Sequence, residues 1–190
     1  MITLATGYNR TSLNNLPRLF NKELSWNYAI YSKNKTLKVR KVNHIKIENT
    51  VLNDIQERFR YREKIDVCDK KGLEYVNNHI LTQRKLDPDY FIRKCFERVI
   101  CGNEMKDLMI TDFQFLNELE FLKKKEKHLT TIRVISNQEG HIGNVDNIDN
   151  LTTDFLFLPL SDHEIMFEKT IKKFPQYRSF LLNKNTYFCV

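Results

Sequence analysis

The sequence predicts an α+β fold in a single domain, with an N-terminal β-hairpin, a helical middle and C-terminal strands around one helix. The chain has 190 residues, a length typical of one domain. Its apolar pattern changes from alternation to helical spacing and back to strand-like runs. Only four prolines and five glycines interrupt it, which favours long regular elements. We divide domain 1–190 into a basic hairpin region (1–50), a helical region (51–127) and a strand and helix region (128–190).

Residues 26–41, WNYAIYSKNKTLKVRK, show the alternation that predicts the hairpin. With a two-residue turn in the middle, the side chains of Trp26, Tyr28 and Val39 share one face. Lys38 and Arg40 fall on the other face. We therefore expect the aromatic residues in the core and the basic residues at the surface.

Apolar residues at helical spacing predict four helices in the middle of the chain. Thr50 and Asp87 are residue types that cap helix N-termini, and Pro88 suits the first turn of a helix. Thr111 and Gln114 have the spacing of a capping box. The predicted helices span residues 50–64, 73–86, 88–101 and 115–127, with Gly72 separating the first two.

The C-terminal region is predicted to contain three strands and one helix. HLTTIRVIS (128–136) is rich in β-branched residues, and TDFLFLPL (153–160) reads as a buried strand. The polar segment 137–152 between them reads as a loop. A capping box at Ser161 and Glu164 precedes a helix with Phe167, Ile171 and Phe174 on one stripe. The tail TYFCV reads as a last strand.

The net charge of +7 is concentrated near the N-terminus. Residues 1–50 contain nine Lys and Arg but only two Asp and Glu. A localised basic excess favours an anionic partner, whereas a protein that imitates DNA would be acidic. The candidate nucleic-acid-binding residues are Lys33, Lys35, Lys38, Arg40, Lys41, Lys46, Arg58 and Arg62. The alternative is a charged surface that serves solubility alone.

A nuclease is the alternative with a motif in its favour. Pro88-Asp89, followed by Glu104-Met105-Lys106, resembles the signature in which two carboxylates bind Mg²⁺ and a lysine positions water. That chemistry needs carboxylates that converge from neighbouring strands, whereas Asp89 is predicted to begin a helix. We therefore expect no catalytic residues, no cofactor and no metal site.

The remaining composition indicates a reduced, cytoplasmic environment. Four scattered cysteines show no zinc-site spacing and no disulfide framework. The longest apolar run, Phe155 to Leu160, is too short to cross a membrane, and the N-terminus has no secretion-signal pattern. Asn occurs 19 times but Ala only twice, as expected from an AT-rich phage or mobile-element genome.

Three segments resemble an uncharacterised bacterial and phage family, domain of unknown function 4238. LPRLFNKE (16–23), with the strand-like YAIYSKNKTLKVRKV after it, resembles the opening of that family. FLPLSDHEIMF (157–167) resembles its later strand-to-helix segment, and LNKNTYFCV its terminal strand. The family's usual His near the opening proline is replaced here by Asn14 and Asn15. The resemblance implies an α+β fold and no particular activity.

The function predicted from these observations is that of a small, non-catalytic, cytoplasmic binding protein. Its expected partner is nucleic acid, or a nucleic-acid-handling complex of the host-defence type that it inhibits, and not a membrane. Two alternatives stay open. One is the metal-dependent nuclease that would use Asp89, Glu104 and Lys106. The other is a structural protein-interaction module whose basic charge is incidental.

Overall fold

The computed structural model describes residues 1–7, 10–33, 35–58, 70–100, 107–113, 115–136, 151–180 and 187–188. The chain divides into two compact units. Unit 1 comprises Met1–His44 and Met105–Val190, and unit 2 comprises Ile45–Glu104. Helices and strands are both abundant, which confirms the predicted α+β class. The single-domain organisation stays a prediction.

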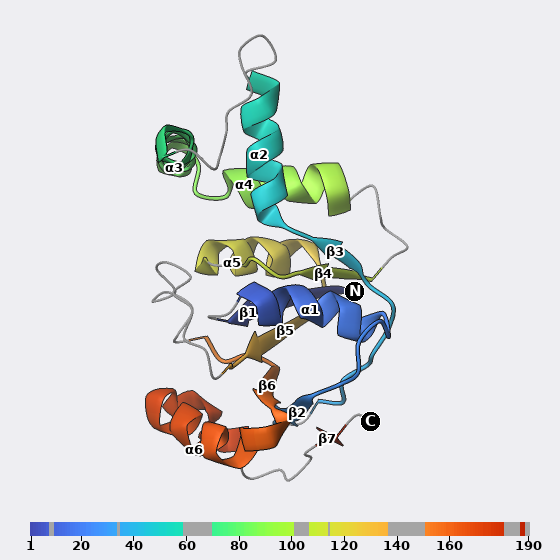
Figure 1. The fold of residues 1–190 in the computed structure, drawn as a ribbon. Helices are drawn as coiled ribbons and strands as arrows, with labels where there is room; N and C mark the ends of the chain where they lie inside the picture. Colours follow the sequence, from blue (N-terminus) through green and yellow to red (C-terminus); the bar gives the residue numbers. More distant parts are fainter. Residues whose placement is uncertain are drawn as a thin grey trace. The chain divides into compact units, whose positions relative to one another are not determined.

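Unit 1 contains most of the strands (Figure 1). In chain order its elements are β1 (Ile2–Gly7), α1 (Arg10–Phe20), β2 (Tyr28–Ser32), β4 (Leu108–Ile110), α5 (Leu116–Lys125), β5 (Leu129–Val134), β6 (Phe155–Pro159), a 3₁₀ turn (Leu160–Asp162), α6 (His163–Lys173), a second 3₁₀ turn (Pro175–Phe180) and β7 (Tyr187–Phe188). β3 (Asn43–Ile45) leads the chain into unit 2. Unit 2 contains α2 (Ile47–Arg58), α3 (Lys70–Leu86) and α4 (Tyr90–Cys95), which a π-helical turn (Phe96–Ile100) continues.

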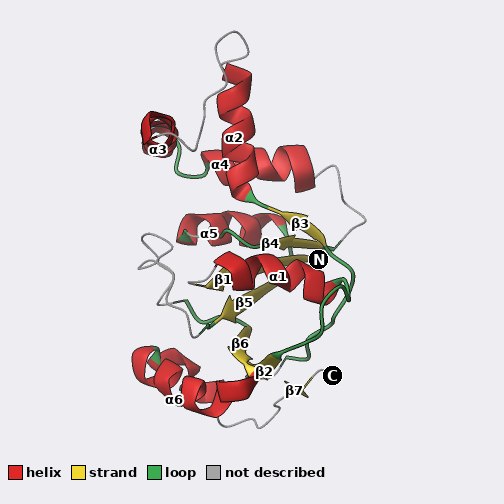
Figure 2. Ribbon diagram, in the orientation of Figure 1, coloured by secondary structure: helices red, strands yellow, loops and turns green. Residues whose placement is uncertain are grey.

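The strands form one sheet in the order β3-β4-β1-β5-β6-β2-β7, which Figure 2 shows from top to bottom. The four strands β4, β1, β5 and β6 are mutually parallel. β2 pairs antiparallel with β6, and β7 pairs antiparallel with β2. All six residues of β1 are buried, as expected of a central strand that is covered on both faces.

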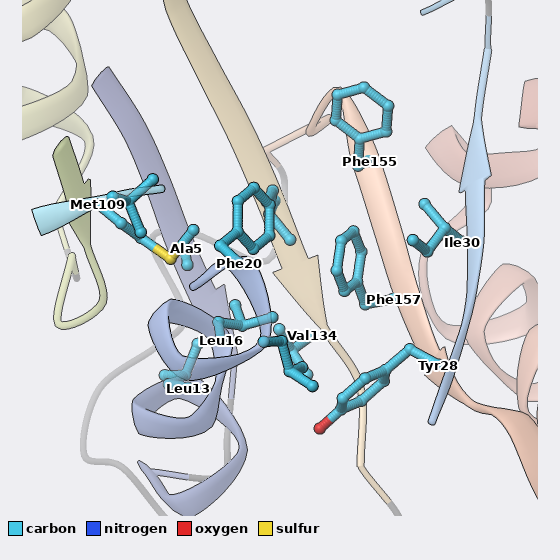
Figure 3. Packing of buried hydrophobic residues seen from close by; sticks show 13 residues of the cluster. Ala5, Leu13, Leu16, Phe20, Tyr28, Ile30, Met109, Val134, Phe155 and Phe157 are labelled. Atoms are coloured by element: carbon cyan, nitrogen blue, oxygen red, sulfur yellow. The ribbon is translucent and has the colours of Figure 1, made fainter. Parts of the chain in front are cut away.

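Helices cover both faces of this sheet. Figure 3 shows the first face, where Leu13, Leu16 and Phe20 of α1 pack with strand residues that include Ala5, Val134 and Phe157. On the other face, Leu156 and Leu158 of β6 form a cluster with Phe167 of α6. Successive residues of β6 thus point to opposite faces, and both faces are apolar. This arrangement explains why FLFLP reads as a continuous apolar run.

The predicted hairpin over residues 26–41 does not form. Its first half is β2, but β2 pairs with β6, where Ile30 lies opposite Phe157. Residues 35–42 belong to no strand, and we call them the strap. The apolar β6 contributes to both core clusters, so pairing with it buries β2 between them. The predicted sidedness is nevertheless confirmed, since Trp26 and Val39 pack against the core while Lys38 is exposed.

The strap crosses the edge of the sheet at which the parallel strands begin. Leu37 and Lys38 line the same small cavity as Thr3 of β1 and Thr130 of β5. At its end, the backbone N–H of Val42 donates to Asn21 Oδ1 (2.8 Å), and Asn21 Nδ2 donates to the carbonyl of Val42 (3.1 Å). The strap therefore has a defined course without belonging to a strand.

In unit 2, the helices form near the predicted positions but begin at other residues. α2 begins at Ile47, so Thr50 lies inside the helix rather than at its cap. Gly72 lies within α3 and separates nothing. The N-cap of α4 is Asp89, while the Asp87 carboxylate accepts a hydrogen bond from the backbone N–H of Asp89 (3.0 Å). Helix ends fray and their boundaries shift by one or two residues, so a single capping residue predicts the first residue of a helix poorly.

The two predicted capping boxes in unit 1 are also wrong. The N-cap of α5 is Phe115, whose backbone N–H donates to Glu118 Oε2 (3.2 Å). Thr111 instead pairs with a histidine of β3, and Gln114 lies outside the described residues. The N-cap of α6 is Asp162, whose side chain makes no capping hydrogen bond. The apolar stripe of α6 is confirmed, since Phe167 is buried.

The three C-terminal strands are confirmed as β5, β6 and β7. Most of the predicted polar loop, residues 137–150, lies outside the described residues. No prediction covered β1, α1 or β4. ITLATG of β1 is buried on both faces and contains small and polar residues, so it shows neither alternation nor a strongly apolar run.

Candidate functional site

The parallel strands all end at one edge of the sheet. Their order in the sheet is β4-β1-β5-β6. After β1 the chain passes through α1 to β2, and after β5 it passes to β6, so both connections lead toward the same side of the sheet. Open α/β sheets bind ligands beyond the carboxyl ends of their parallel strands. We call the part of this edge that lies beyond the ends of β1 and β5 the carboxyl edge.

Gly7 ends β1 at this position. It lies opposite Val134, the last residue of β5. A Cβ atom on Gly7 would lie only 2.5 Å from the carbonyl oxygen of Val134, which is closer than real Cβ contacts. The two strands can thus approach one another at the carboxyl edge only because residue 7 has no side chain.

Helix α1 begins at Arg10, three residues after Gly7. The first turn of an α-helix presents unpaired backbone N–H groups and the positive end of the helix dipole. The first turn of α1 contains no acidic residue that would neutralise this end. Thr11, in that turn, is exposed. Together with Gly7, this sequence of strand, glycine and helix start is suited to an anionic ligand.

Polar residues also follow the neighbouring strands at the carboxyl edge. Thr111 and Asp112 come directly after β4, and Ser136 comes two residues after β5. Thr111 is buried, and its Oγ1 lies 2.6 Å from Nε2 of His44. Sequence reasoning missed this edge because no phosphate-binding glycine motif is present. The signal that could have found it is the isolated TG at the end of a segment that becomes the central strand.

The predicted basic site is distributed along the opposite edge of the sheet. Lys33, Lys38 and Lys41 are exposed, as is Arg40, whose Nη1 lies 3.8 Å from Oδ2 of Asp107. Lys35 Nζ lies 2.5 Å from Oδ1 of Asp154. Lys35 and Arg40 therefore each have a carboxylate near them.

The other three predicted basic residues lie outside this group. Lys46 and Arg58 belong to unit 2, and Lys46 is half-buried. Arg62 lies outside the described residues. The part of the prediction that the structure brings together is thus Lys33, Lys35, Lys38, Arg40 and Lys41.

Unit 2 contains a buried polar cluster that sequence reasoning missed. The side chain of Asp54 on α2 is only 2% exposed. Its Oδ1 accepts hydrogen bonds from Lys94 Nζ (2.8 Å) and Tyr90 Oη (2.9 Å), and its Oδ2 lies 3.0 Å from His79 Nε2. The sequence feature that could have indicated this cluster is the position of Asp54 between Val51 and Ile55. Both of these residues are buried, and Asp54 lies with them on the apolar stripe of α2.

The surroundings of Asp54 hold its carboxyl group ionised. Burial alone would raise its pKa, but the hydrogen bonds from Lys94, Tyr90 and His79, with the charge of Lys94, lower the pKa to about 2. The hydrogen bond to Asp54 in turn raises the pKa of Lys94 above its ordinary value. This cluster joins α2, α3 and α4 by one carboxylate, so we interpret it as a structural feature of unit 2.

The structure describes one of the three residues of the nuclease alternative. Asp89 is the N-cap residue of α4, whereas Glu104 and Lys106 lie outside the described residues. Within the described ranges, no group of three or more His, Cys, Asp or Glu side chains could hold a metal ion. Nor does any helix in those ranges have the length and apolar character needed to span a membrane.

The chain was compared with known protein families and with curated proteins. No family model matches it, and no curated protein matches it. The resemblance to the domain of unknown function 4238 stays a prediction.

Proposed function

We propose that unit 1 binds a phosphate-bearing small molecule of the nucleotide class at the carboxyl edge of its sheet. The observation that carries this proposal is the close approach of Gly7, the last residue of β1, to Val134 of β5, with α1 starting three residues later. Sheets of this kind bind ligands beyond the carboxyl ends of their parallel strands, and a helix that starts there favours phosphate groups. The net charge of +7 is compatible with an anionic ligand.

A substitution in the first turn of α1 tests this proposal. Thr11→Glu places a carboxylate near the start of the helix, where it stabilises the helix but repels an anion. The binding of adenosine 5′-diphosphate and of pyrophosphate is measured by titration calorimetry. We expect affinity to fall at least tenfold in Thr11→Glu and to stay within about twofold in the uncharged control Thr11→Gln. Equal affinities for Thr11→Glu and the native chain would refute the proposal.

The second candidate function is nucleic-acid binding through the cations of residues 33–41. The observation in its favour is that Lys33, Lys38, Arg40 and Lys41 are exposed along one edge of the sheet. Adjacent cations on an extended segment could follow a phosphate backbone. A neutral explanation is that they keep an edge segment soluble.

The dependence of binding on salt concentration distinguishes nucleic-acid binding from a surface charge that only keeps the segment soluble. If each of Lys38, Arg40 and Lys41 contacts one phosphate group of the nucleic acid, replacing all three by Ala should reduce the salt dependence of binding. The slope of the logarithm of the association constant against the logarithm of the salt concentration should become shallower by about 2 to 3 units. The matched control replaces Lys123, Lys124 and Lys125, which are exposed in the last turn of α5. The control should leave the slope unchanged. If the native chain binds neither DNA nor RNA with a dependence on salt, the second candidate function is wrong.

A further inference from the structure

Helix α3 of unit 2 has an exposed side that neither proposed function uses. Its half-buried residues recur every three or four positions, which places them on one stripe of the helix. They include Val76, His79, Ile80 and Gln83. His79 lies 3.0 Å from the Asp54 carboxylate of α2, and its ring packs edge-on against Phe91 of α4, so this stripe faces the other helices of unit 2 (Figure 1). The opposite side of α3, which we call the outward face, is turned away from them.

Three polar residues lie along the middle of the outward face. Lys71, Asn78 and Lys85 are all exposed, and successive members of this series are seven residues apart. Seven residues make nearly two turns of an α-helix, so the three side chains leave the helix in nearly the same direction. The two lysines are about 21 Å apart along the helix axis, at about 1.5 Å per residue. The outward face thus has a cation near each end and an amide group between them.

The charge of α3 favours an anionic partner. Its sequence, KKGLEYVNNHILTQRKL, contains four Lys and Arg residues but only one acidic residue, Glu74. Elsewhere in unit 2, Lys94 and Arg98 are held in ion pairs by carboxylates of α2. The two lysines of the outward face are exposed to solvent instead. An anionic partner can therefore approach α3 from its outward face.

The form of the outward face favours double-stranded DNA among anionic partners. The major groove is about 12 Å wide and admits an α-helix, and an asparagine amide in it forms two hydrogen bonds with adenine. Leu81 and Glu74 are exposed one helical turn from Asn78 on either side. Their side chains offer an apolar contact for the methyl group of thymine and an acceptor for the amino group of cytosine. A protein interface would instead have an aromatic or arginine anchor at its centre.

We propose that the outward face of α3 enters the major groove of double-stranded DNA. The ammonium groups of Lys71 and Lys85 contact phosphate groups. The amide group of Asn78 donates a hydrogen bond to N7 of an adenine and accepts one from its N6 amino group. This role belongs to unit 2 alone, because α3 shares no residue with the strap or with the carboxyl edge.

The phosphate contacts are tested with a mixed-sequence DNA duplex of about 20 base pairs, by fluorescence anisotropy on the full chain. The parent chain for this test has Lys38, Arg40 and Lys41 replaced by Ala, so that the strap does not contribute. Replacing Lys71 and Lys85 by Gln in this parent should lower the affinity at least tenfold at about 0.1 M salt. The slope of the logarithm of the association constant against the logarithm of the salt concentration should become shallower by about 2 units, because each lysine contacts one phosphate group.

The matched control replaces Lys123 and Lys124, which are exposed near the end of α5, by Gln and should change neither quantity. All these side chains are exposed, so the melting temperature of each variant should stay within about 2 °C of the parent chain. The duplex should bind at least tenfold more tightly than its separated strands, which carry phosphate groups but form no groove. Equal binding of single strands, an unchanged slope in the variant of Lys71 and Lys85, or tighter binding of poly-glutamate than of the duplex would each overturn the proposal.

The base contact is tested with a duplex that the native chain selects from a pool with a random central sequence. Its adenines are replaced one at a time by 7-deazaadenine, which lacks the N7 acceptor. At one position, this change should weaken the binding of the native chain at least fivefold but that of Asn78→Ala by less than about twofold. Asn49→Ala, which removes an exposed amide on α2, is the control and should respond as the native chain does. Failure to select any sequence, or an equal response of Asn78→Ala and the native chain at every adenine, would overturn the assignment of Asn78.

Discussion

At the scale of single residues, two residues lie in surroundings that are unusual for their residue types. Asp54 is a buried acidic residue that stays charged because Lys94, Tyr90 and His79 surround it. Gly7 is the residue that permits the close approach of β1 to β5. Neither property is visible in the sequence, because both depend on partners brought from distant parts of the chain.

The depressed pKa of Asp54 predicts a specific dependence of stability on pH. Its folded-state pKa of about 2 lies below its ordinary value of 3.8. The ionised form therefore stabilises the folded state by about 2 kcal/mol above pH 4, and this contribution is lost as the pH falls through about 2. Asp54→Asn should lower the free energy of unfolding by about that amount at pH 7 and by much less at pH 2. Urea unfolding over this pH range is the measurement.

The control for this prediction is Glu120→Gln on α5. Glu120 is exposed, so its substitution should change the free energy of unfolding by less than about 0.5 kcal/mol at either pH. A difference between Asp54→Asn and the native chain that stays constant from pH 7 to pH 2 would show that the carboxylate is not held ionised as described.

At the scale of elements, sequence reasoning succeeded where one residue pattern decides the structure. HLTTIRVIS and TDFLFLPL become β5 and β6 because β-branched and aromatic residues there are buried by neighbouring layers. It failed for the pairing of β2, since alternation identifies a strand but not its partner. For the candidate site, too, sequence reasoning succeeded in one part and failed in another. The basic residues near the strap were visible as charge, whereas the carboxyl edge depends on strand order, which local pattern does not contain.

The course of the strap gives an element-scale prediction. Asn21 makes two hydrogen bonds to the backbone of Val42, so its side chain replaces a missing strand partner. Asn21→Ala should lower the free energy of unfolding by about 1–3 kcal/mol and accelerate hydrogen exchange at the Val42 amide. Asn27→Ala, at an exposed position before β2, is the matched control and should do neither. Unchanged exchange at Val42 in Asn21→Ala would contradict the role given to Asn21.

At the scale of the whole molecule, the proposed roles are divided among different parts. Unit 1 contains the parallel sheet with its carboxyl edge and the strap. Unit 2 contains the outward face of α3 and the Asp54 cluster, which joins its own helices. A ligand at the carboxyl edge should therefore alter residues at one end of the parallel strands and leave both the strap and the Asp54 cluster unchanged.

The most direct test of the carboxyl-edge proposal is to titrate the isotope-labelled full chain with adenosine 5′-diphosphate and record every backbone amide shift by NMR. We expect saturable shifts that are largest at Gly7, Thr11 and Ser136, where β1, α1 and β5 meet the proposed ligand. The amides of Lys38, Lys41 and Asp54 should move little and serve as internal controls. Shifts confined to the strap or to unit 2, or no saturable shift at Gly7 and Thr11, would contradict the proposed function.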